Sequence, residues 1–135
     1  MTKSIKFGVY IPGDLAKELE ELSKQIGVSS RSKLIQEALQ LFISEHKWRT
    51  EGRVVGVITI IYNHDIGNVD EKLTDIQHKY IEEIVTSLHV HLSSDKCLQV
   101  IVVKGDSRKI RNLVNELMNL KGVLAVRTSL LGEPT

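Results

Sequence analysis

A short alternating segment near the start of the chain limits the fold more than any other feature. Residues 5–11 read IKFGVYI, and the apolar side chains at every second position predict a strand with two distinct faces. One face carries Lys6, Gly8 and Tyr10. A strand without a partner leaves its edge exposed and is not stable alone. Since no second strand lies nearby in the sequence, we predict an obligate dimer in which this strand pairs with its own copy.

Two helices are predicted after this strand. Pro12 ends the strand because proline cannot donate a backbone hydrogen bond, Asp14 can cap the first helix, and Gly27 can end it. The second helix follows Ser29 and Ser30 and runs through RSKLIQEALQLFISEHKW, where apolar residues recur at helical spacing. The first part of the chain is therefore predicted to be a dimer joined by a two-stranded ribbon.

The rest of the chain predicts a second domain. The polar segment KWRTEGR at residues 47–53 is interpreted as a linker. Beyond it we expect a strand in RVVGVITIIYN, a helix over residues 69–86, and strands in LHVHL and CLQVIVVKG around the turn SSDK. A helix capped by Asp106 or Ser107 and ended by Gly122 precedes a last strand in VLAVRTSLL. The order βαββαβ is typical of a ferredoxin-like fold.

The composition limits the kinds of partner. The 135 residues fit one domain or two small ones, assigned here as residues 1–48, a linker at 49–53 and residues 54–135, in the α+β class. With 18 basic and 17 acidic residues the chain is no polycation, so nucleic-acid binding would need a local basic surface and a dimer. No apolar run is long enough to cross a membrane and the start lacks a signal peptide, so we expect a cytoplasmic protein.

Three of the five histidines and the single cysteine lie close together in the sequence: His78, His89, His91 and Cys97. His89 and His91 are two apart on a predicted strand, so both imidazoles leave the same face. If His91 pairs with Cys97 across the hairpin, the thiolate joins that face. His78 lies on the preceding helix and could complete the site in its own chain or in a neighbouring one. This pattern predicts a metal site.

The donor set limits the metal without identifying it. Three imidazoles and one thiolate suit a borderline or soft divalent ion rather than magnesium or calcium. A tetrahedral site would indicate zinc, and a planar one nickel or copper, so these three metals stay open. A zinc enzyme is disfavoured, because catalytic zinc keeps one position open. His46, at a helix end, and His64, in a turn, are interpreted as structural residues.

The stretch QHKYIEEIVTSLHVHLSSDKCLQVIVVKGD, residues 77–106, resembles the nickel-responsive transcriptional regulators, which join a ribbon-helix-helix domain to a regulatory domain of the ACT type. The resemblance extends over nearly the whole chain. It implies one Ni²⁺ per subunit in a planar site, with His78 supplied by a different subunit from the other three ligands, which are His89, His91 and Cys97. It also implies a homotetramer that binds a double-stranded DNA operator with two half-sites and represses nickel-uptake genes.

The resemblance also assigns DNA contacts to the N-terminal domain. Family members often have a hydroxyl-bearing residue where this chain has Gly8, so base readout is expected to rely on Lys6 and Tyr10. The start of the second helix is expected to bind a DNA phosphate through its free backbone N–H groups. The residues at that position are Ser29, Ser30 and Arg31.

Two further positions depart from the family pattern. Lys33 stands where some relatives carry an acid that helps to hold a cation between the domains, and we hypothesise that its ammonium replaces that cation. Gln99 replaces a carboxylate near the metal. An amide can accept a hydrogen bond from a ligand histidine but lacks the charge, so weaker metal affinity is expected. Alternatively, Gln99 is an ordinary strand residue that faces solvent.

Two other binding functions compete with metal sensing. ACT-type domains often bind amino acids, so the chain could be a small-molecule sensor in which the histidines are incidental and the cysteine fills the core. Ribbon-helix-helix domains also occur in antitoxins, although a structured C-terminal half argues against a disordered tail that wraps a toxin.

Overall fold

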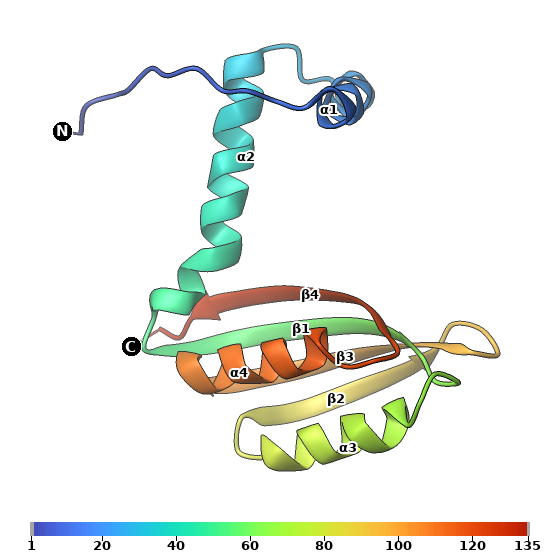
Figure 1. Cartoon of the computed structure of the whole chain (residues 1–135). Coiled ribbons are helices and arrows are strands. Elements are labelled where there is room, and N and C mark those ends of the chain that lie inside the picture. Colours follow the sequence, from blue (N-terminus) through green and yellow to red (C-terminus); the bar gives the residue numbers. More distant parts are fainter. Residues whose placement is uncertain (1, 135) are drawn as a thin grey trace. The chain divides into compact units, whose positions relative to one another are not determined.

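The computed structural model describes residues 2–134 of the chain. It divides into two compact units, the first ending at Gln40 and the second beginning at Leu41. Figure 1 shows helix α1 (Gly13–Ile26), which belongs to the first unit, and helix α2 (Arg31–His46), within which the boundary between the units falls. These helices confirm the predicted N-terminal pair.

The signals at the helix ends are confirmed in two cases and wrong in a third. Gly27 follows α1 with a φ of 78°, a conformation that favours glycine. Ser30 caps α2, because its Oγ accepts a hydrogen bond from the Lys33 N–H at 3.2 Å. The prediction that Asp14 caps α1 is wrong. Pro12 occupies the cap position and Asp14 lies in the first turn, where the helix dipole favours a carboxylate.

Residues 5–11, predicted as a strand, belong to no helix or strand in the single chain. Ile5 is 79% exposed and Tyr10 is 90% exposed. Neither α1 nor α2 has a buried residue among those described, so the apolar stripes of both helices are at most partly covered in the single chain. A lone strand has no partner for its N–H and C=O groups, and the pairing of two copies through this segment stays a prediction.

The second unit contains an antiparallel sheet with the strand order β2-β3-β1-β4. Its elements are β1 (Arg53–Asn63), α3 (Val69–Lys79), β2 (Ile84–His91), β3 (Lys96–Asp106), α4 (Ser107–Met118) and β4 (Val123–Gly132) (Figure 1). The predicted order βαββαβ and the α+β class are confirmed. Among residues 2–134, no helix combines the length and apolar character needed to span a membrane.

The predicted helix over residues 69–86 is too long. α3 ends at Lys79 and β2 begins at Ile84, which pairs with Val103 of β3. Ile84 and Thr86 are β-branched, and such side chains lose χ1 freedom in a helix but pack well on a sheet. Pairing with β3 therefore determines the structure of a segment whose apolar spacing alone is also compatible with a helix.

One face of the sheet forms the core of the second unit. Alternate side chains of β1 and β3 are buried on this face, where α4 contributes Ile110, Leu113 and Leu117. Gly56 of β1 lets β4 approach closely, since an added Cβ would lie 2.1 Å from the Ser129 carbonyl oxygen. The opposite face of the sheet exposes apolar side chains such as Leu88 and Leu131.

Trp48 joins this core from a segment that the sequence suggested was a linker. It lies in the 3-10 helix η1 (Lys47–Thr50) and is 1% exposed. The following backbone is also held, because Ser107 donates its N–H to the Gly52 carbonyl at 3.1 Å and its hydroxyl to the Glu51 carbonyl. Burial of an indole removes a large apolar area from water, which explains why this polar segment packs against the sheet and α4.

Candidate metal centre

The β2–β3 hairpin brings three of the predicted ligands together. His91 pairs with Cys97 across the hairpin, as expected from the sequence. The donor atoms of His89, His91 and Cys97 all lie within 4.8 Å of one another. The Cys97 Sγ is 3.6 Å from Nδ1 of His91. A zinc-sized ion lies about 2.3 Å from a sulfur ligand and about 2.0 Å from a nitrogen ligand, so one ion can contact both atoms.

The three donors differ in exposure. Cys97 is 1% exposed on the inner strand β3, whereas His89 and His91 are exposed on β2, which forms an edge of the sheet. The thiol therefore lies at the core and the two imidazoles lie at the surface. This arrangement leaves a side of the cluster accessible to a further ligand from outside the chain.

His78 does not belong to this cluster. It is exposed near the C-terminal end of α3, and the group of close metal-ligating side chains within residues 2–134 includes His89, His91 and Cys97 but not His78. The sequence left open whether His78 completes the site of its own chain or of a neighbour. Its place in the single chain favours a neighbour, and its role as a ligand stays a prediction.

Tyr62 is a member of the site that the sequence did not indicate. Its hydroxyl oxygen is 3.2 Å from Nε2 of His89, and it pairs with Cys97 along β1 and β3. Burial, followed by the negative charges of Asp70 and Cys97, raises the pKa of the Tyr62 phenol well above its ordinary value. The hydroxyl therefore stays protonated near neutral pH. It can orient the His89 ring, leaving Nδ1 available to a metal.

Gln99 lies next to these residues, but its surroundings differ from those that the sequence led us to expect. It is opposite His89 in the β2–β3 ladder and opposite Ile60 in the β1–β3 ladder. Its exposed fraction is 8%, so the alternative of a solvent-facing strand residue is wrong. Because β3 is flanked on both sides, alternate residues on its core face are buried whatever their polarity. The hydrogen bond to His89 comes from Tyr62 rather than from Gln99.

His46 and His64 have local structural contacts. His46 lies beside the ring of Phe42, with centroids 4.5 Å apart, and its Nδ1 accepts a hydrogen bond from Nε of Arg49 at 3.3 Å. Nε2 of His64 is 2.6 Å from the carbonyl oxygen of Ser94, which ties the loop after β1 to the β2–β3 hairpin. These contacts agree with the structural interpretation of both residues.

The predicted DNA-contacting residues are exposed in the single chain. Lys6, Gly8 and Tyr10 are exposed on the unpaired N-terminal segment. At the start of α2, Ser30 acts as the cap, and the Arg31 guanidinium lies 3.8 Å from the Glu20 carboxylate with both side chains largely exposed. A pair this exposed contributes little to stability, so Arg31 can exchange it for a phosphate. Ser29, the remaining predicted contact, is exposed too, and so is Lys33, whose ammonium was expected to replace a cation rather than to contact DNA.

Two family models match separate parts of the chain. The NikR C terminal nickel binding domain matches residues 55–131, and the ribbon-helix-helix domain matches residues 4–47. The first range contains the β2–β3 hairpin with its cluster of donors. The second range contains residues 5–11 and both of the helices that follow them.

The chain is also similar to curated proteins named "Putative nickel-responsive regulator". It is 43% identical over 120 residues to the one from Pyrococcus horikoshii, covering 88% of this chain and 87% of that protein. It is 41% identical over 133 residues to the one from Methanocaldococcus jannaschii, covering 97% and 94%. It is 41% identical over 124 residues to the one from Dictyoglomus thermophilum, covering 91% and 92%.

A solved structure shares part of the fold at lower identity. The uncharacterized protein TM1266 from Thermotoga maritima has a TM-score of 0.53 and 21% identity, and the match covers 58% of this chain and 98% of that one. This likeness concerns the fold alone.

Proposed function

This chain belongs to the family of nickel-responsive regulators that carry a ribbon-helix-helix domain and a NikR C-terminal nickel-binding domain, and we propose that it represses nickel-uptake genes when nickel is bound. The family consists of regulators rather than enzymes. The observation that carries the proposal is the convergence of His89, His91 and Cys97 within 4.8 Å in the part of the chain that matches the nickel-binding domain.

The residues of this cluster fit a nickel ion by their chemistry. Two imidazoles and a thiolate are ligands for borderline and soft divalent metals, and the accessible side of the cluster leaves room for His78 of a second subunit. We assign one Ni²⁺ to each subunit, held by His89, His91 and Cys97 of one chain. The bound ion would join two subunits through its ligands, and Tyr62 would hold the His89 ring in the ligating orientation.

Two exposed surfaces of the single chain support the proposal of an oligomer. The N-terminal segment, residues 5–11, can pair with its copy, which completes a two-stranded ribbon. The sheet face opposite the helices exposes Leu88, which is 62% exposed, and Leu131, which is 66% exposed. An apolar face of this kind indicates contact with another chain. A homotetramer, built from two ribbon-helix-helix dimers around the C-terminal units, covers both surfaces.

The tetramer can hold two DNA half-sites at once. Each ribbon would enter a major groove, which admits a two-stranded ribbon, with Lys6 and Tyr10 facing the bases beside Gly8. The start of each α2 would contact a phosphate through Ser29, Ser30 and Arg31. Simultaneous binding raises the affinity only when the spacing of the two ribbons matches that of the half-sites. A metal that prefers one arrangement of subunits therefore changes DNA affinity.

The test is DNA affinity with and without nickel. Double-stranded sequences can be selected from a random pool with the nickel-loaded protein, and binding to the selected duplex can then be measured by fluorescence anisotropy. We expect nickel to raise the affinity, and Lys6→Ala to lower the affinity without changing nickel binding. An affinity that is the same in the presence of nickel and of a chelator would overturn the proposal. Parallel titrations with zinc and copper would identify a response to another metal.

A further inference from the structure

In the last turn of α3 the His78 side chain faces solvent, whereas the residues directly after it contact other parts of the same chain. His78 is exposed. The backbone around it is closed by local hydrogen bonds, with the Tyr80 N–H bonded to the Ile76 carbonyl at 3.1 Å and the Ile81 N–H to the His78 carbonyl at 3.3 Å. The His78 imidazole therefore extends into solvent from a turn whose backbone is held by hydrogen bonds within the single chain.

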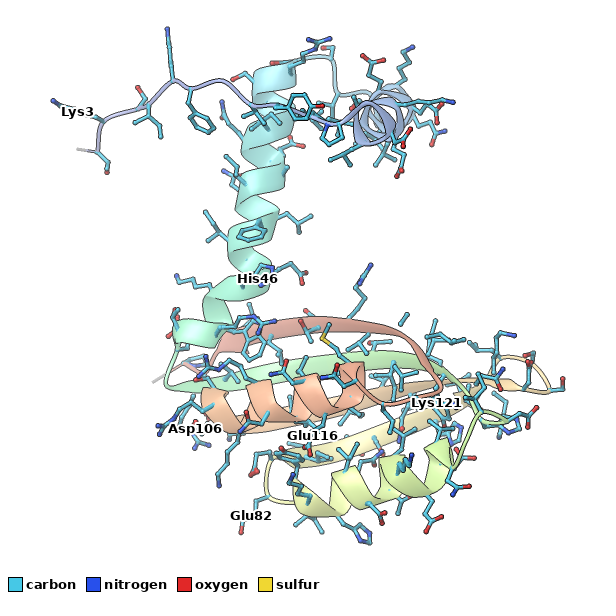
Figure 2. All side chains as sticks on the ribbon, in the orientation of Figure 1. Lys3, His46, Glu82, Asp106, Glu116 and Lys121 are labelled. Carbon is cyan, nitrogen blue, oxygen red and sulfur yellow. The ribbon has the colours of Figure 1, made fainter. Side chains whose placement is uncertain are left out.

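A contact with α4 restrains this turn. The Lys79 ammonium lies 2.7 Å from Oε1 of Glu116, and Glu116 lies on α4 (Figure 2). The same ammonium is 5.5 Å from the centre of the Tyr80 ring, and Tyr80 is 7% exposed within the core. Lys79 and Tyr80 therefore fasten the residues directly after His78 to the rest of the unit. We call Lys79 and Glu116 the α3–α4 clamp.

One of the two carboxylate oxygens of Glu116 is buried. This atom, Oε2, has no hydrogen-bond partner among the described residues, although 35% of the side chain as a whole is exposed. A buried carboxylate oxygen is best tolerated when the charge is balanced nearby, and the ammonium of Lys79 provides that balance. The ion pair therefore restrains the Glu116 carboxylate, and its contribution is modest because the Lys79 side chain is 61% exposed.

We propose that Lys79 and Glu116 are positioning residues for His78, which hold the last turn of α3 in place before the metal binds. The inference rests on the proposed function, in which His78 serves a nickel site of another subunit. α3 is a helix of 11 residues, a length that is only marginally stable without tertiary contacts, and helix ends fray first. A turn that is already ordered costs less to immobilise when a ligand binds.

The expected size of the effect is small and measurable. Partly exposed ion pairs make modest contributions, so loss of the clamp should weaken nickel binding by about two- to fivefold. The variants Lys79→Met and Glu116→Gln each remove one charge. The reversed pair Lys79→Glu with Glu116→Lys restores an ion pair with the charges exchanged. Lys72→Met is the matched control, because Lys72 is also an exposed lysine of α3.

Three measurements on the full-length protein test this inference. Nickel affinity is obtained by competition with a chelator, the thiolate-to-nickel absorption band reports the coordination at saturation, and amide hydrogen exchange follows residues 76–81 without metal. We expect both single variants to bind nickel more weakly and to exchange faster at residues 76–81, with an unchanged absorption band. The reversed pair should recover most of the affinity, and Lys72→Met should resemble the parent.

His78→Ala separates this inference from the proposed function. Against a His78→Ala background, Lys79→Met should have no further effect on nickel affinity, because a positioning residue acts through the ligand it positions. If His78→Ala binds nickel as the parent does, the ligand assignment fails and the inference fails with it. If His78→Ala weakens binding while Lys79→Met and Glu116→Gln do not, or if the reversed pair gives no recovery, only the positioning role is overturned.

Discussion

Replacement of Tyr62 by phenylalanine isolates the contribution of one hydroxyl to nickel binding. The hydroxyl oxygen is 3.2 Å from Nε2 of His89, and the ring lies in the core with 2% exposure. Tyr62→Phe keeps the ring and its packing but removes the hydrogen-bonding partner of the imidazole. The metal-free protein should therefore fold normally, while the His89 ring gains freedom that it must lose again when it binds the ion.

The size of this effect follows from the exposure of His89. Loss of a residue that orients a ligand histidine typically lowers metal affinity by about 10- to 100-fold. His89 is exposed, so water can replace part of the lost contact, and we expect the lower end, about tenfold or about 1.4 kcal/mol. Because the pKa of Tyr62 is raised, the phenol stays neutral and the ratio of the two affinities should not change between neutral and mildly alkaline pH.

Competition with a chelator of known nickel affinity measures the difference between the parent and Tyr62→Phe. Tyr10→Phe is a matched control, since it removes the same atom from an exposed tyrosine of the first unit. Thermal unfolding of the metal-free proteins checks that the core is intact. The reasoning is refuted if Tyr62→Phe binds nickel as tightly as the parent, or if Tyr10→Phe weakens binding by the same factor.

Three further predictions concern stability. Trp48→Ala removes a fully buried indole and should cost about 3–5 kcal/mol of unfolding free energy in urea titrations, and a loss below about 1 kcal/mol would contradict its place in the core. Gly56→Ala places a Cβ against the Ser129 carbonyl oxygen and should lower the unfolding free energy by about 1–3 kcal/mol or more. Gly8→Ala is the control, because a Cβ at Gly8 meets nothing within 4 Å, and it should leave the thermal midpoint unchanged. The hydrogen bond from Lys79, and after it the nearby Tyr80 hydroxyl, lowers the pKa of Glu116. The stabilising contribution of Glu116 is therefore present above its ordinary pKa and is lost as the pH falls through the lowered value. Acid titrations of the parent should show this loss, and Glu116→Gln should reduce it.

The order of elements and the hairpin of the site could be predicted because they depend on short-range patterns. Alternation and turn residues located the strands of the second unit apart from the start of β2, and the two-residue spacing of His89 and His91 predicted their common face. The pairing of His91 with Cys97 needed only a tight turn between adjacent strands. These relationships involve residues that are close together in the sequence, so the spacing of residue types along the chain is enough to predict them.

The remaining members of the site depend on contacts between distant segments. Tyr62 meets Cys97 only because β1 lies next to β3 in the sheet, and no spacing along the chain specifies that neighbour. The burial of Trp48 depends similarly on the packing of η1 against β4 and α4. The end of α3 was misplaced because residues 84–86 satisfy a helical apolar pattern as well as a strand, and pairing with Val103 decides between them.

The buried position of Trp48 also provides an optical reporter within the chain. It is the single tryptophan of the sequence, and it lies in the core of the C-terminal unit. Its fluorescence will therefore follow the melting of that unit alone, whereas far-ultraviolet circular dichroism records the helices of both units. A difference between the two melting curves would give the separate stabilities of the N-terminal and C-terminal units without a label.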